Sequence, residues 1–307
     1  MKIIRPVTLT DAMLSASNVK ETDYTAWNVA TDYTAGDKCI KTTGIHKIYE
    51  ALVNVTGGDS PEIDVLAAVP KWVEISSTNR WKAFDNKVGS QTSNATSITY
   101  SIAPGQVVDS IAFLNLEALS VNVTITDPVE GEIYNTTTDL AMTQLTGLSA
   151  VIDWYTYFFA PFSYVTEFVL FDLPPYVNET IAITISYTGG TAKVGGIVFG
   201  LQATLGNTLY SPTVGIHDYS IKEANAFGEY AITERAYSDK MTCDFTVETA
   251  YISDVKKLLS LYRATAMVYV AVESYSSTII YGFYKEFGIV ISYPAYAICS
   301  IEIEGLT

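Results

Sequence analysis

The sequence predicts a mainly β protein, and three observations lead to that class. Short runs rich in β-branched and aromatic residues recur along the chain, often with apolar and polar positions alternating. Turn signals such as Pro104-Gly105 and Gly189-Gly190 interrupt these runs. Only residues 254–263 have the spacing of an amphipathic helix longer than one turn. At 307 residues, the chain is expected to divide into units 1–78, 79–205 and 206–307.

The first unit, residues 1–78, is expected to be a small three-stranded domain. A single helical turn at Asp11–Leu14, capped by Thr10, precedes strands predicted at 38–41, 47–53 and 72–75. Gly36, Gly44 and the turn cluster 57–61 separate them. Because aliphatic positions are few here, the core must come from aromatic side chains, and the candidates are Trp27, Tyr33, Tyr49 and Trp72.

The second unit, residues 79–205, carries strand signals almost without interruption. Six or more short strands at this spacing indicate a β-sandwich, most simply a jelly roll. The segment Asn79–Asp85 is expected to wrap one end of it. The predicted strands are 97–102, 110–116, 121–126, 168–171, 180–187 and 194–200.

The third unit, residues 206–307, is predicted to be an α+β domain. Ser253 is expected to cap a helix at 254–263 that places Val255, Leu258, Leu259 and Tyr262 on one face. The last predicted strand alternates apolar with polar residues, so at least one of its faces is expected to be buried. The predicted strands are 245–249, 266–273, 287–292 and 297–304.

Composition and charge point to protein partners. Hydrophobic residues make up 49% of the chain and charged residues only 17%, which indicates a surface that partners cover. The 22 tyrosines suit interfaces, and they suit an ordinary β-sandwich surface equally well. With 18 basic and 33 acidic residues, the net charge of −15 repels phosphate, so we expect no nucleic-acid partner.

The cysteines and the apolar segments exclude several classes of protein. Cys39, Cys243 and Cys299 are odd in number and far apart, so they are predicted to be reduced, buried thiols without a disulfide framework or a zinc site. The amino terminus lacks the apolar core of a secretory signal. The most apolar stretches, 155–162 and 266–272, are too short to span a bilayer, so no membrane insertion is expected.

No catalytic constellation is evident, and the chain is predicted not to be an enzyme, with no cofactor and no metal. His46 and His217 are the only histidines. The run His217-Asp218-Tyr219-Ser220 is interpreted as a solvated loop, because adjacent residues point in different directions. Asp127, Glu130 and Glu132 are interpreted as a polar hairpin loop instead of a calcium site. Any two carboxylates can converge in a fold, so an acid pair for glycoside hydrolysis stays open.

One pattern in the first unit is similar to a known family. Trp27, Tyr33, Gly36-Asp37, a strand, Gly44, Tyr49-Glu50-Ala51, a turn ending at Pro61, and Trp72 follow in order. This resembles the small carbohydrate-binding module of chitinases, with the pattern Trp, Tyr-x-x-Gly-Asp, a strand, Gly, Tyr-x-Ala, Pro and Trp. Where sugar-binding members carry exposed aromatics, this chain has Leu52-Val53-Asn54-Val55. The resemblance implies the fold, and it implies that Trp27, Tyr33, Tyr49 and Trp72 form either a sugar platform or a core.

The segments on either side of this module carry a second resemblance. Ser17-Asn18-Val19, Glu21–Tyr24, Thr78–Trp81 and Phe84-Asp85 look like a joint found in virion and tail proteins of tailed bacteriophages. More weakly, the resemblance extends through Asp218-Tyr219-Ser220 and Arg235–Ser238 to the ending Ile301–Gly305. It would then cover nearly the whole chain.

The phage resemblance implies a structural, tail-associated virion protein that is made in the host cytoplasm. Its partners would be other virion or tail proteins and copies of itself in a homo-oligomer. The alternative is a host-attachment lectin that binds cell-surface glycans. A depolymerase ranks third, because neither an acid pair nor a long β-helix repeat is recognisable.

Overall fold

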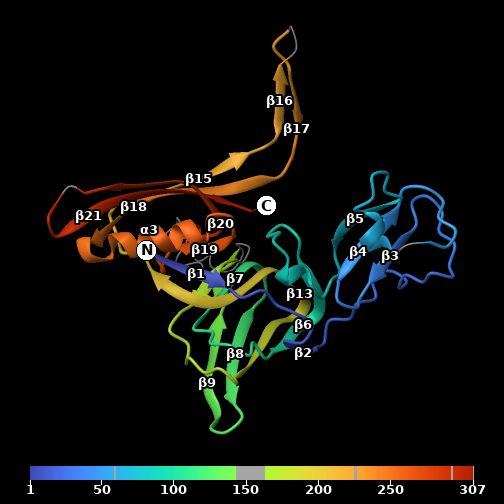
Figure 1. Cartoon of the computed structure of the whole chain (residues 1–307), viewed down its shortest axis with the longest axis horizontal. Helices are drawn as coiled ribbons and strands as arrows, with labels where there is room; N and C mark the ends of the chain where they lie inside the picture. The colour runs from blue at the N-terminus through green and yellow to red at the C-terminus, as the bar shows by residue number, and fades with distance from the viewer. Residues whose placement is uncertain (59, 143–162, 225–226, 292, 307) are drawn as a thin grey trace, which may run out of the picture.

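The computed structural model describes residues 1–58, 60–142, 163–224, 227–291 and 293–306. Strands make up 52% of these residues and helices 8%, which confirms the mainly β class (Figure 1). The apolar stretch 155–162, residue 59 of the first unit's turn cluster and residue 292 at the end of a predicted strand lie outside the described residues. Within the described ranges, no helix is long and apolar enough to cross a membrane.

The first unit contains the expected three-stranded antiparallel sheet. Its order is β3 (Lys38–Lys41), β4 (Lys47–Ala51) and β5 (Trp72–Ser77), with the short helix α1 (Pro61–Asp64) in the last connection. Figure 1 shows this small sheet at one side of the molecule. The turn between β3 and β4 uses Gly44 at φ +72°, a left-handed conformation that glycine adopts without strain.

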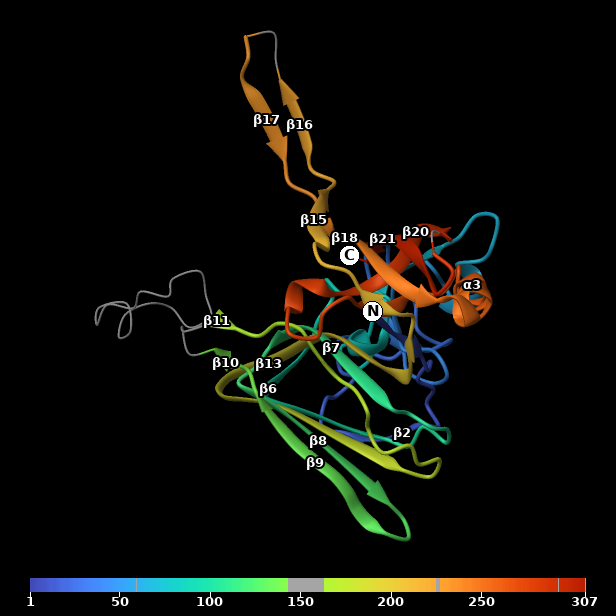
Figure 2. The same ribbon diagram turned by 90° about the vertical axis from the view of Figure 1, so that its left-hand side faces the viewer.

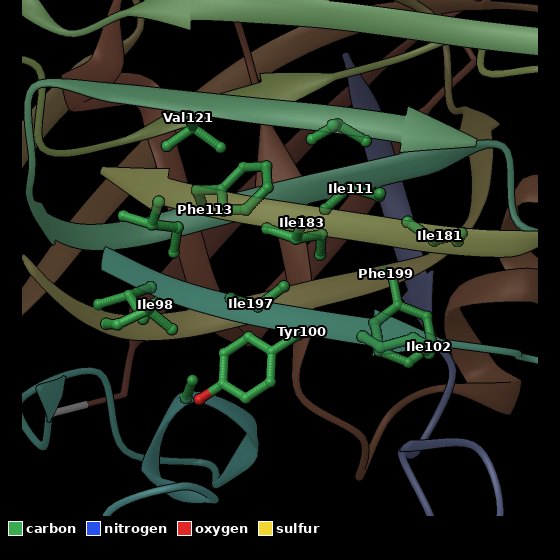
Figure 3. Close-up of a cluster of buried hydrophobic side chains, with 14 of the residues drawn as sticks. Ile98, Tyr100, Ile102, Ile111, Phe113, Val121, Ile181, Ile183, Ile197 and Phe199 are labelled. Atoms are coloured by element: carbon green, nitrogen blue, oxygen red, sulfur yellow. The ribbon is translucent and has the colours of Figure 1, made fainter. Parts of the chain in front are cut away.

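The second unit is a β-sandwich. The long strand β13 (Thr180–Thr204) pairs through residues 180–186 with β6 (Thr92–Ile102) and β8 (Ser120–Asp127), and through residues 193–200 with β7 (Ser110–Glu117). Ile98, Tyr100, Phe113, Ile183 and Phe199 meet in its core (Figure 3). Three further elements extend it: β2 (Leu14–Ser17), β9 (Gly131–Asp139) and β12 (Phe168–Leu170). A two-stranded pair, β10 (Ala141–Met142) and β11 (Ser163–Tyr164), lies beside them.

The prediction of two separate strands at 180–187 and 194–200 is wrong. One strand of 25 residues runs through both, and its register with β6 shifts between Ser186 and Thr191. Gly189 has φ +84°, and on β6 Thr96 has φ +62°. Both strands therefore bulge at the same point, and the glycine pair bends the strand without reversing it.

The predicted wrap at Asn79–Asp85 and the polar hairpin at Asp127 are both confirmed. The Asn79 side chain donates to the Ser93 carbonyl at 2.8 Å, and the Tyr100 hydroxyl donates to the Arg80 carbonyl at 2.7 Å. Asp127 Oδ1 accepts from the backbone N–H groups of Val129 and Glu130 at 2.8 and 3.0 Å, which shapes the turn between β8 and β9.

The third unit packs a sheet against one helix. Phe245 and Met241 on β18 (Tyr237–Glu248) share a core with Val255 and Leu259 of α3 (Ile252–Leu261). Strand β1 (Lys2–Pro6) pairs with β13 on one side and with β19 (Met267–Val270) on the other, so one sheet runs from the sandwich into this unit. The remaining strands are β14 (Asn207–Thr208), β15 (Thr213–Asp218), β19 (Met267–Val270), β20 (Ile279–Val290) and β21 (Tyr296–Gly305).

Two details of the third unit differ from expectation. The helix begins at Ile252, with Tyr251 at the N-cap position, so Ser253 lies inside the helix and does not cap it. The 3₁₀ turn η3 (Thr249–Tyr251) leads directly into α3, so the chain is already helical before Ser253. The prediction also missed β15, whose side chains are exposed, and residues 279–286 of β20, of which the first four are buried. All three cysteines are buried free thiols, as predicted.

Candidate functional site

The four aromatic residues of the small module come together, and three of them lie in its core. Trp72, Tyr49 and Tyr33 are 1%, 3% and 9% exposed. Tyr33 meets Trp72 edge to face with ring centroids 5.0 Å apart. Trp27 packs partly buried against this core, with the Lys41 ammonium 4.6 Å from its ring centroid. The faces of these three buried rings contact other protein groups. A ring that stacks on a sugar must instead present its face to solvent.

The Gly36-Asp37 turn of the module also has a structural explanation. Gly36 adopts φ +93°, and its N–H donates to the Ala51 carbonyl at 2.8 Å. Asp37 accepts from the backbone and the hydroxyl of Thr34, which lowers the pKa of its carboxyl. Leu52 and Val53, which follow β4, are about half exposed. The exposed apolar surface beyond β4 is therefore aliphatic.

A second cluster lies at the joint between the module and the sandwich, around His46. The imidazole Nδ1 lies 2.7 Å from Glu21 Oε1, and Nε2 lies 2.6 Å from Asp11 Oδ1. The ring stacks on Trp81 with centroids 4.0 Å apart. An ionised carboxylate only accepts hydrogen bonds, so both contacts are satisfied when both ring nitrogens carry protons. With both ring nitrogens engaged, His46 links Asp11 and Glu21 at this joint.

The carboxylates of this cluster are tied to both flanks of the module. Glu21 accepts from the Thr78 hydroxyl at 2.6 Å and pairs with Arg80 at 3.4 Å. Burial opposes ionisation of Asp11, but hydrogen bonds from His46 and the Gly44 N–H outweigh it and lower the pKa of Asp11. A groove of about 640 Å³ runs beside His46 and Trp81. The sequence identified the flanks as a joint but missed His46, because its partners are far away along the chain.

The interpretation of His217 to Ser220 as a solvated loop is partly wrong. His217 and Asp218 lie on β15, opposite Ser238 and Tyr237 of β18. The His217 ring stacks on Tyr219 with centroids 4.5 Å apart, and the Tyr219 hydroxyl donates to the buried Glu304 Oε1 at 2.6 Å. An ion pair with Lys285 and the bond from Tyr219 lower the pKa of Glu304. These contacts fasten a projecting hairpin to the sheet.

A carboxyl pair, which the sequence did not single out, lines a cleft between the sandwich and the third unit. Glu167 and Asp239 both border this cleft of about 400 Å³. Burial, with a smaller contribution from the Asp239 charge, raises the pKa of Glu167 to about 7, and burial also raises the pKa of Asp239. Raised carboxyl pKa values occur at catalytic acids and at structural sites alike. Among the described residues, no three His, Cys, Asp or Glu side chains gather as metal ligands.

The most prominent surface is a hairpin, which we call the arm: residues 213–224 and 227–237. Its root is β15 paired with the start of β18, and its outer part is β16 (Ile221–Ala224) paired with β17 (Tyr230–Thr233). Figure 1 and Figure 2 both show it standing away from the body. Among the described strands, β16 and β17 pair only with each other. Tyr230 and Ile232 are 69% and 68% exposed.

Comparisons with known proteins add no assignment to these surfaces. No family model matches the chain, and neither a curated protein nor a solved structure matches it. Function is therefore inferred from the geometry of the described residues and from the resemblances in the sequence.

Proposed function

We propose that the chain is a structural subunit of a tailed-phage particle, associated with the tail, which assembles through repeated protein–protein contacts. The observation that carries the assembly is the arm. A two-stranded ribbon without further layers is marginally stable in water. This ribbon also exposes Tyr230, Ile232 and, at its root, Ile216, which is 64% exposed. A protein partner that covers those side chains would stabilise the ribbon and shield its apolar surface from water.

The proposed association with the tail rests on the sequence resemblance. The projecting arm of the subunit supports it. A subunit that offers an arm at one place and receives one at another makes a heterologous contact. Such contacts close into rings or extend into filaments, which are the symmetries of a phage tail. The net charge of −15 disfavours nucleic acid as the partner.

The lectin alternative has less support. Its expected platform of Trp27, Tyr33, Tyr49 and Trp72 is mostly core, and the surface beyond β4 carries Leu52 and Val53. Stacking on a pyranose ring requires exposed aromatic faces. The lectin reading therefore needs a surface other than the one implied by the resemblance.

The decisive experiment is quantitative mass spectrometry of purified phage particles from a lysate that expresses this chain. A structural subunit is expected at several copies per particle after stringent washing. Absence of the chain from purified particles would contradict the structural proposal and the lectin alternative together.

A further inference from the structure

We propose that Glu167 and Asp239 form a pH-dependent latch, which holds the root of the arm against the sandwich in acid and releases it above neutral pH. The proposal goes beyond the assembly proposed above, because it concerns the orientation of the arm within one chain. It is carried by the place of the two carboxyls in the fold and by the charges that surround them.

Asp239 lies where the arm leaves the sheet. Strand β18 pairs with β21 from Lys240 onward, so Asp239 is the last residue before this pairing begins. On its other side β18 pairs with β15, which places Asp239 opposite Ile216 of the arm. Figure 2 shows the arm rising from this end of the sheet. Hinge motions are absorbed by a few residues at such ends, so a turn of the backbone at Asp239 swings the whole arm.

Glu167 is held on the opposite wall of the cleft, by the sandwich. The Leu116 N–H of β7 donates to the Thr166 carbonyl at 2.9 Å, and Phe168 of β12 pairs with Phe113 of β7. Glu167 therefore lies between two residues that are bound to the same strand. The facing wall belongs to the arm and to the start of β18. A force between the two carboxyls therefore moves the arm and not the sandwich.

No described cation balances the two carboxyls. Neither forms an ion pair or a side-chain hydrogen bond among the described residues. Lys240, next to Asp239, lies on the opposite face of β18, where it pairs with Glu302 at 2.9 Å. The other titratable side chains next to the cleft are Lys87, Glu117, Asp218, Arg235 and Tyr237. None of these contributes to the raised pKa values, which come from burial and, for Glu167, from the charge of Asp239.

Protonation decides whether the two carboxyls are compatible with a closed cleft. When one is protonated, the pair carries at most one charge, whereas two ionised carboxyls repel each other across a partly desolvated space. The pKa of Glu167 is raised to about 7 in the closed cleft, and that of an exposed glutamate is about 4.3. The closed form therefore binds more protons than the open form between these values. It loses stability relative to the open form as the pH rises.

A contact on the other face of the sheet keeps the arm attached when the latch opens. The Tyr219 hydroxyl donates to Glu304 at 2.6 Å, and this bond and the Lys285 charge lower the pKa of Glu304. Glu304 therefore stays ionised over the pH range in which Glu167 titrates. The arm turns about this contact and does not unfold from the sheet.

The test is the distance between two spin labels in the full chain, measured by pulsed electron paramagnetic resonance at pH 5 and pH 8.5. Glu223→Cys places one label on the arm and Ala95→Cys places the other on the sandwich, both at exposed positions. The labelled chain is diluted into unlabelled chain, so that only distances within one chain are measured. The ratio of the pH 5 distance population to all others should fall at least about tenfold at pH 8.5, because one pKa unit is a tenfold change in an equilibrium constant.

Glu167→Gln and Asp239→Asn, each in the labelled chain, are expected to keep the pH 5 distances at pH 8.5, because an amide stays neutral. Asp244→Asn is the matched control, since it removes an exposed carboxylate from the same strand and should respond like the parent. Distances in the parent that do not change with pH, or a change that persists in either amide variant, would overturn the latch. The proposed function stands or falls separately, on the presence of the chain in particles.

Discussion

Trp72 is the residue on which the small module depends most. Its side chain is 1% exposed, contacts Tyr33 edge to face and lies in a core with Tyr49 and Cys39. Trp72→Ala is therefore expected to destabilise the module by about 3–5 kcal/mol. Hydrogen exchange of the β3, β4 and β5 amides in the full chain would measure this loss locally.

The control for Trp72→Ala is Leu52→Ala, because the Leu52 side chain is half exposed and should change stability by less than about 0.5 kcal/mol. Wild-type protein is expected to show no measurable binding to chitin or host polysaccharide. Glycan binding that Trp72→Ala abolishes without faster amide exchange would contradict the core role and favour the lectin alternative.

The buried carboxyl of Glu179 should make the stability of the protein fall as the pH rises. Its side chain is 1% exposed, and contact with the Tyr176 backbone offsets the effect of burial only in part. Burial raises its pKa to about 7, whereas the pKa of an unfolded glutamate is about 4.3. Between these values the folded state binds more protons than the unfolded state, so stability falls as the pH rises.

Glu179→Gln removes the charge that burial penalises. We expect little change in the free energy of unfolding near pH 4 and a gain of about 1–3 kcal/mol at pH 8, measured by urea denaturation. Glu132→Gln, on an exposed side chain, is the control and should stay within about 0.5 kcal/mol at both pH values. An equal effect of Glu179→Gln at both pH values would contradict the buried, protonated carboxyl.

Among the elements, the contact between β1 and β13 is the most sensitive to a single atom. A Cβ added at Gly200 would lie 1.9 Å from the Arg5 carbonyl oxygen, which is backbone and cannot turn aside. Gly200→Ala should therefore push β1 off β13 and cost about 1–3 kcal/mol in the free energy of unfolding, read by urea denaturation.

Gly288→Ala is the matched control for that strand contact. A Cβ there meets nothing within 4 Å, although Gly288 also lies in a strand, so its substitution should be nearly neutral. If both substitutions lowered the free energy of unfolding by the same amount, the loss would come from strand propensity and not from the close approach of β1.

Elements with a strong local pattern could be predicted from the sequence, and those set by distant contacts could not. The module strands, the sandwich and α3 follow from β-branched runs, glycine turns and helical spacing. The bulge at Gly189 needs its partner at Thr96, and the arm has too few buried positions to produce an alternating pattern. The His46 cluster joins residues 11, 21, 46 and 81, so no local signal could reveal it.

At the scale of the whole molecule, the cleft with Glu167 and Asp239 offers the sharpest test of the prediction that the chain is not an enzyme. Structural carboxyl pairs have raised pKa values for the same physical reason as catalytic ones, namely burial. We expect no release of reducing ends from bacterial polysaccharides, with or without divalent metal. Release that disappears in both Glu167→Gln and Asp239→Asn would show that the cleft is catalytic.

Light scattering of the full chain at micromolar concentration tests the proposed assembly. We expect a mass that is a multiple of 33.5 kDa. Replacing arm residues 221–233 with a short turn should reduce the mass to that of one chain while the β content of the body is preserved. A clean wild-type monomer that also fails to bind purified tail proteins would contradict the proposed assembly.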